Sequence, residues 1–211
     1  MKDLTVTDWT KALGSKDGKY GGGSAASVVG AFAVNLAQFV FEFQQGKKKY
    51  EGQETAIQAA IARSKAISEE LLDLAEIDAD AFEPVLPLFR LPKDTEEERV
   101  IRQQKINHGL ADAARPPLAI MKKMDEVLDL FEQLIKLEVK GSIVDDIAVG
   151  LIFTEATIES EKINCDINTK SIKDETLRTE IETEVDEAYG TILERCRALK
   201  TTTFRIIHHN V

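Results

Sequence analysis

Three consecutive glycines, Gly21, Gly22 and Gly23, stand before Ser24 and a long helix-prone segment. The first backbone N–H groups of a helix have no partner within the helix, and the helix dipole adds positive charge there. Such a turn can bind an anion or stabilise an oxyanion. The spacing Gly-x-x-x-x-Gly-Lys is absent and no strand precedes the turn, so it is not a nucleotide phosphate loop. On the motif alone, a tight turn with Ser24 as helix N-cap is the more common explanation.

A basic run, Lys47, Lys48 and Lys49, follows Gly46 and precedes Tyr50. It closes the helix that the glycine turn opens, where lysines also complement the negative end of the helix dipole. In a chain of formal net charge -10, three adjacent lysines are a suitable counter-charge for a carboxylated or phosphorylated ligand. A solvated charge cluster explains them equally well.

Two pairs of acidic residues lie on predicted helices. Asp78 and Asp80 flank one alanine, and side chains two residues apart on a helix point to different faces, so they do not form one paired site. Asp145 and Asp146 lie within an apolar helical segment. A partly buried carboxylate needs a hydrogen-bonded partner, and burial raises its pKa toward the range of a general base. For Asp146, a catalytic role and a structural role are equally supported.

Several other classes of site are disfavoured. His-x-x-x-His and Cys-x-x-Cys spacings are absent, as is Gly-x-Gly-x-x-Gly, so we predict neither a metal site nor a nicotinamide cofactor. Cys165 and Cys196 have no nearby ligand partners and are expected to be buried, reduced thiols. The net charge of -10 argues against general nucleic-acid binding.

The whole chain is predicted to be helical. With 43% hydrophobic and 30% charged residues and five prolines, it has the composition of a globular helical protein. Apolar periodicity predicts a single domain, 1–211, built as an up-and-down bundle of about five main helices. The predicted helices are residues up to 13, 24–45, 53–82, 95–134 with a bend at 116–117, 142–163 and 174–199. The apolar segment 24–43 contains polar residues and is interpreted as a core helix, not a membrane span. No signal peptide is recognisable, and we expect a soluble cytoplasmic protein.

Taken in order, these motifs resemble the formiminotransferase-cyclodeaminase C-terminal family, which includes stand-alone methenyltetrahydrofolate cyclohydrolases. The segments that carry the resemblance are 21–26, 46–50, 78–82, 91–98, 144–149, 164–168 and 171–174. Two positions depart from the family pattern: Tyr20 replaces a proline before the glycines, and Asp145 replaces a serine in the fourth helix.

The resemblance implies a homodimer that binds a folate at or near the subunit interface, with a tetrahydrofolate derivative as substrate and no separate cofactor. The implied chemistry, hydrolysis or ammonia release at the carbon bridging N5 and N10, passes through a tetrahedral carbon between two nitrogens. The candidate catalytic residues are Asp146, Lys48 and Asp80. The candidate binding residues are Gly21, Gly22, Gly23, Ser24, Lys47, Lys49, Tyr50 and Asp145.

The resemblance implies one of two activities, and the departures at Tyr20 and Asp145 leave a third function open. The absence of a transferase domain favours the cyclohydrolase, which converts 5,10-methenyltetrahydrofolate and water to 10-formyltetrahydrofolate. The alternatives are a formiminotetrahydrofolate cyclodeaminase and a non-catalytic, folate-binding or structural helical dimer.

Overall fold

The computed structural model describes residues 3–209, and within that range every regular element is a helix. The all-helical prediction is therefore confirmed. The elements in chain order are α1 (Val6–Leu13), α2 (Gly22–Gln44), η1 (Lys48–Tyr50), α3 (Glu54–Ala81), η2 (Glu83–Arg90), α4 (Glu96–Ala113), α5 (Arg115–Lys136), α6 (Val144–Thr169) and α7 (Glu175–His209).

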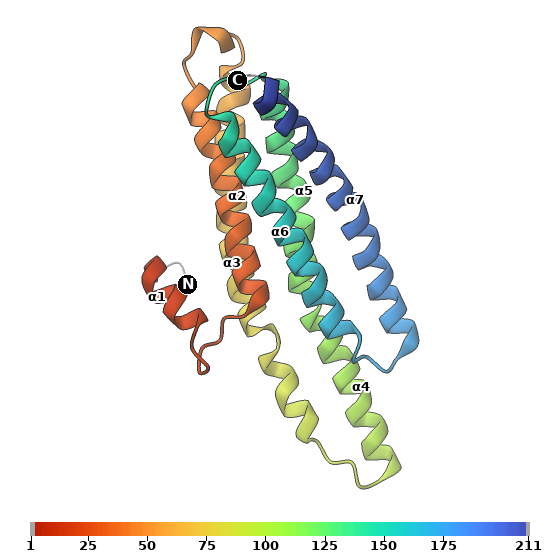
Figure 1. Cartoon of the computed structure of the whole chain (residues 1–211). Coiled ribbons are helices and arrows are strands. Elements are labelled where there is room, and N and C mark those ends of the chain that lie inside the picture. Colours follow the sequence, from red (N-terminus) through yellow and green to blue (C-terminus); the bar gives the residue numbers. More distant parts are fainter. Residues whose placement is uncertain (1–2, 210–211) are drawn as a thin grey trace.

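Five long helices form the bundle (Figure 1). Helix α5 packs against α2, α3, α6 and α7, while α2 lies between α3 and α6. Successive long helices run in opposite directions, so the start of α2 lies at the same end as the last turns of α3 and α6. Beyond this end, η2 and α4 extend as a hairpin with a small core of its own around Val85, Ile106 and Leu110.

Capping residues and prolines in the sequence predicted several helix boundaries correctly. Thr95 and Glu98 form the expected capping box, in which each side chain accepts from the other residue's backbone N–H at the start of α4. Pro116 and Pro117 lie in the first turn of α5, where missing N–H donors cost nothing. The chain therefore restarts as a new helix at the prolines.

Two predicted helix ends are wrong. Helix α6 continues to Thr169, past the break expected at Asn164, and α7 continues to His209, past the predicted end at residue 199. The Asn164 amide donates to Glu161. The Asn168 amide donates both to the Ala113 carbonyl and to the Asn164 carbonyl of its own helix, so both side chains are hydrogen-bonded within a helix that continues. The added turns of α7 pack apolar side chains against the core.

Helix α2 has the length and composition of a membrane span, but 61% of its most apolar window is buried within the bundle. Small residues on α2 and α6 allow the two helices to approach closely. A Cβ added at Gly150 of α6 would overlap the Phe131 ring of α5 and come within 3.4 Å of the Ala33 carbonyl oxygen of α2. Gly150 therefore sets the spacing between three helices.

We expect Gly150→Ala to lower the free energy of unfolding by about 1–3 kcal/mol, because the added methyl overpacks the α2–α5–α6 contact. Urea denaturation measures the change. The matched control is Gly190→Ala in α7, where no atom lies within 4 Å of the added Cβ. The control should be neutral or stabilising by up to about 1 kcal/mol through helix propensity. Equal destabilisation by both substitutions would contradict the packing argument.

Candidate functional site

The N-terminus of α2 binds a carboxylate of the protein itself. Gly21 is the N-cap residue and supplies no side-chain hydrogen bond. Instead, Ser24 Oγ donates to Asp78 Oδ2 of α3 at 3.2 Å, and the Ser24 backbone N–H donates to the same carboxylate. The expectation that Ser24 is the N-cap is wrong, because it lies inside the helix. The anion that the glycine turn holds is Asp78, at the positive end of the helix dipole.

Close approach to this carboxylate explains the glycine at position 23. A Cβ on Gly23 would lie 2.5 Å from both carboxylate oxygens of Asp78, closer than any van der Waals contact allows. A Cβ on Gly22 would lie 3.5 Å from Asn164 Oδ1 of α6. The turn is thus held between α3 on one side and α6 on the other.

Glu161 is a second carboxyl group at this place, which the sequence analysis did not identify. It lies one turn before Asn164 on α6, is fully buried, and accepts a hydrogen bond from Asn164 Nδ2 at 3.1 Å. Burial, and after it the charge of Asp78, raise the pKa of Glu161 to about 9, against the opposing hydrogen bond from Asn164. Glu161 is therefore a neutral acid at pH 7. The signal in the sequence was its position, three residues before Asn164 on an apolar helix.

Asp78 differs from Glu161 in being half-buried and reachable from solvent. Burial raises its pKa above the ordinary value for an aspartate, while the two hydrogen bonds from Ser24 act in the opposite direction. The site thus pairs a carboxyl group that solvent can reach with a buried one that keeps its proton. Such a difference between neighbouring carboxyl groups is typical of sites that transfer protons.

Asp80, the residue proposed from the sequence, lies on a different face of α3. Its side chain is 55% exposed and accepts an ion pair from Lys19, with a distance of 2.9 Å between Nζ and Oδ1. Lys19 also pairs with Glu76 at 2.7 Å, and Tyr20 donates to Glu76 at 2.9 Å. Tyr20 therefore fastens the segment before the glycine turn to α3. Asp78 contacts the glycine turn, whereas Asp80 pairs with Lys19.

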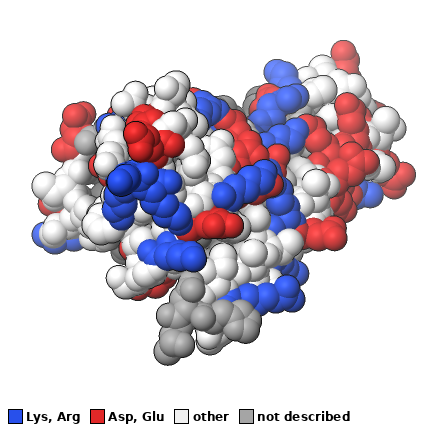
Figure 2. Space-filling view, turned by 90° about the horizontal axis from the view of Figure 1, so that it is seen from above, with Lys and Arg blue, Asp and Glu red and all other residues white. Residues whose placement is uncertain are grey.

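The other predicted site residues lie at the opposite end of the bundle. Lys47, Lys48, Lys49 and Tyr50 follow the C-terminus of α2, about 35 Å from its first residue for a helix of this length. Tyr50 is buried in the core, and Lys49 donates to the Glu138 carbonyl. Figure 2 looks onto this end and shows Lys and Arg side chains gathered there, interspersed with acidic ones.

Asp145 and Asp146 lie in the first turn of α6, also at this distant end. Burial and then the neighbouring Asp145 raise the pKa of Asp146. Within one chain, the structure brings Gly21, Gly22, Gly23 and Ser24 together with Asp78. It does not bring the lysines or Asp145 and Asp146 to the same place.

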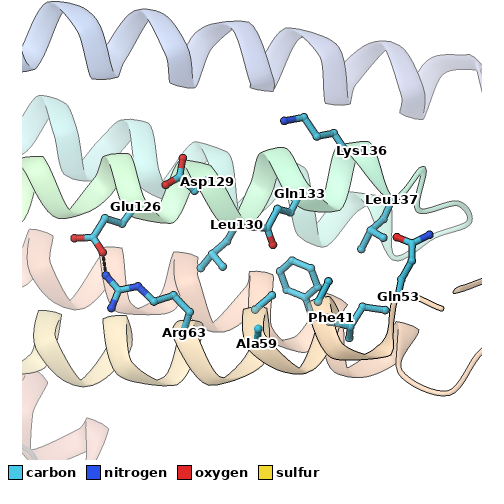
Figure 3. A pocket seen from close by; sticks show the side chains of 13 residues that line it. Phe41, Gln53, Ala59, Arg63, Glu126, Asp129, Leu130, Gln133, Lys136 and Leu137 are labelled. Carbon is cyan, nitrogen blue, oxygen red and sulfur yellow. Dashed lines mark ion pairs between the residues drawn. The ribbon is translucent and has the colours of Figure 1, made fainter. Parts of the chain in front are cut away.

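A cavity of about 520 Å³ lies between α3 and α5, toward the lysine end (Figure 3). Phe41 and Leu130 contribute to its apolar floor, and Arg63 at its edge pairs with Glu126. None of the candidate catalytic or binding residues predicted from the sequence lines this cavity. We therefore place the candidate site at the glycine turn.

Comparison with known proteins gives a consistent set of relatives. Residues 5–187 match the formiminotransferase-cyclodeaminase family. A protein named methenyltetrahydrofolate cyclohydrolase from Methylorubrum extorquens is 30% identical over 90% of this chain and 89% of its own length. Formimidoyltransferase-cyclodeaminase from Rattus norvegicus is 26% identical over 84% of the chain, which spans only 33% of that relative. The crystal structure of formiminotetrahydrofolate cyclodeaminase from Thermotoga maritima superposes with a TM-score of 0.84, at 27% identity and 98% coverage of both chains.

The protonated state of Glu161 has a consequence for stability. A carboxyl group with a raised pKa in the folded state binds a proton that the unfolded chain has already lost, so stability falls as pH rises from about 4.5 to about 9. The contribution is at most about 1.4 kcal/mol per pH unit. We expect Glu161→Gln to remove this slope and to be more stable than the parent protein at pH 8.

Urea denaturation at pH 5 to 8 measures the difference between the two proteins. Glu159→Gln, an exposed neighbour on the same helix, is the matched control and should keep the parent's pH dependence. A parent protein and Glu161→Gln variant with parallel pH dependence would show that Glu161 is ionised in the folded state.

Proposed function

The chain belongs to the formiminotransferase-cyclodeaminase family, and from this premise we propose that it is a methenyltetrahydrofolate cyclohydrolase. The relative named methenyltetrahydrofolate cyclohydrolase matches it over almost the whole of both chains. The rat relative with a transferase in its name is about three times as long as the segment matched. The 30% identity to the cyclohydrolase relative and the near-complete coverage of both chains support the cyclohydrolase proposal.

A second candidate function is the cyclodeaminase. It is supported by the Thermotoga maritima structure, which bears that activity in its name and corresponds to this chain over 98% of both lengths. The two reactions share a tetrahedral carbon between N5 and N10, and both need a proton delivered to the departing nitrogen. One arrangement of side chains can serve either reaction.

The observation that carries the proposal is the position of Asp78 at the N-terminus of α2. As a half-buried carboxylate with a raised pKa, Asp78 is suited to accept a proton from the water that attacks the bridging carbon. The oxygen of that water becomes the formyl oxygen as the bond from carbon to N5 breaks. Asp78 then returns its proton to N5, and the second water proton leaves to solvent. The positive end of the α2 dipole, at which Asp78 lies, favours the ionised form of this base.

We propose that the active form is a homodimer of this chain. Helix α2 exposes Phe32, Phe39 and Phe43 along one stripe, each about half accessible. The neighbouring helix α6 exposes a second stripe that includes Val149 and Ile152. Two such apolar stripes on adjacent helices form a surface suited to a second copy in an isologous contact.

An antiparallel dimer of this kind would also bring together candidate residues that lie at opposite ends of one subunit. A two-fold axis perpendicular to α2 places the C-terminal end of α2 in one copy beside the N-terminal end in the other. The lysines 47–49 and Asp146 of one subunit would then lie near the glycine turn of its partner. The charge of these lysines suits the carboxylated tail of a folate.

We also propose that the protein works in the cytoplasm. Cys165 and Cys196 are buried free thiols that are not joined to each other. Unpaired thiols fit a reducing compartment.

We expect Asp78→Asn to lower kcat/KM by about 10²–10⁴-fold, because an amide cannot accept the proton of the attacking water. Asp80→Asn, two residues away on the solvent-exposed face, is the matched control and should retain activity within about threefold. The assay follows the loss of the methenyltetrahydrofolate chromophore without any nicotinamide. Circular dichroism checks that both variants remain folded.

Three measurements on the parent protein separate the three functions: loss of the methenyltetrahydrofolate chromophore, ammonia release and folate binding. A parent protein that gives no acceleration over buffer would refute the cyclohydrolase. Ammonia release from 5-formiminotetrahydrofolate would select the cyclodeaminase. Folate binding without turnover of either substrate would select the non-catalytic dimer.

We expect Phe39→Glu to convert the dimer to a monomer, because it buries an unpaired charge in the apolar contact. Analytical ultracentrifugation measures the mass against the 23.4 kDa of one chain. Activity should fall together with the dimer if lysines from the partner complete the site. Val100→Glu, an exposed apolar position on α4, is the control and should remain dimeric. A parent protein that sediments as a monomer would contradict the proposal.

A further inference from the structure

Glu161 is a fully buried carboxyl group close enough to the proposed base for the charge of Asp78 to act on it. It is inaccessible to solvent, and the one turn of α6 that separates it from Asn164 places both residues beside the glycine turn. A buried carboxyl group without its full set of hydrogen bonds is costly, so its presence in the core calls for an explanation.

The hydrogen bonds of Glu161 indicate where its proton resides. Oε2 accepts from the Asn164 amide at 3.1 Å, and therefore acts as the carbonyl oxygen of the acid. Oε1 is buried and has no hydrogen-bond partner among the described residues. The proton is accordingly on Oε1, which makes this atom a donor in need of an acceptor.

Asp78 is the charged group that acts on Glu161 from a neighbouring helix. On α6 itself, Cys165 is a buried neutral thiol that donates to the Ala114 carbonyl, and Lys162 is paired with Asp166 and Asp186. Helix α2 presents the uncharged Ser24 and the glycines to this place. The acceptor that suits the Oε1 proton is therefore the Asp78 carboxylate.

We propose that Glu161 is a positioning residue whose protonated carboxyl group donates a hydrogen bond that keeps Asp78 ionised and oriented for proton transfer. The inference rests on the proposed function insofar as Asp78 is the base. Ser24 supplies two donors to Asp78 from the side of α2, and Glu161 supplies the third from the side of α6. Glu161 keeps its own proton throughout, so Asp78 alone exchanges a proton with the substrate.

Two substitutions test this role in the full-length protein. Glu161→Gln keeps an acceptor for Asn164 and replaces the Oε1–H donor by an amide N–H. Glu161→Leu has a similar volume but no donor. We expect the pKa of Asp78 to rise by about one unit or more in Glu161→Leu and to stay near the parent value in Glu161→Gln, as expected for loss of a hydrogen bond to a charged group.

The pKa of Asp78 is read without catalysis, by NMR titration of ¹³C-labelled aspartate carboxyl groups, with Asp78→Asn identifying the resonance. The activity readout is the acid limb of the pH profile of kcat/KM, which should move to higher pH by the same amount in Glu161→Leu only. Infrared spectroscopy at neutral pH should detect the carbonyl stretch of a protonated acid in the parent and in Glu159→Gln. That band should be missing in Glu161→Gln.

Three results would overturn the proposal. One is an unchanged Asp78 titration in Glu161→Leu, and another is an equal shift in both variants. The third is a missing protonated-acid band in the parent, which remains decisive even if Glu161→Leu does not fold. If the titration shifts as expected but the parent turns over neither folate, the positioning role stands and the proposed function fails.

Discussion

The contact between the carboxylate of Asp78 and the N-terminus of α2 determines most of the geometry at the candidate site. It requires glycine at position 23, because any side chain there would collide with the carboxylate oxygens. It also joins the first turn of α2 to the last turns of α3 through Ser24. Because Asp78 satisfies the helix terminus from outside the helix, no local N-cap side chain is needed.

Helix propensity, apolar periodicity and capping residues were sufficient to predict the fold class and most helix positions. These signals are local, and the capping box at Thr95 illustrates how well they work. The ends of α6 and α7 were missed because tertiary contacts decide them. Asn164 looks like a helix breaker until Glu161 is seen to accept its amide.

The site was only partly predictable, for a similar reason. The sequence identified the glycine turn, but not which acid meets it, since Asp78 and Asp80 differ only by about 200° of rotation around α3. Glu161 could not be recognised as buried without knowing which face of α6 meets α2. The lysines and Asp146 are separated from the turn by the length of α2, which no reading of spacing along the chain reveals.

The place of Glu161 on α6 also links the assembly of the site to protonation. Asp78 and Ser24 belong to the α2–α3 hairpin and can meet as soon as that hairpin closes, whereas Glu161 joins them only when α6 docks. Near neutral pH the unfolded chain carries Glu161 as an anion, while the folded protein holds it as an acid. Docking of α6 is therefore coupled to the uptake of a proton from the solvent. Folding thus takes up one proton when α6 completes the candidate site.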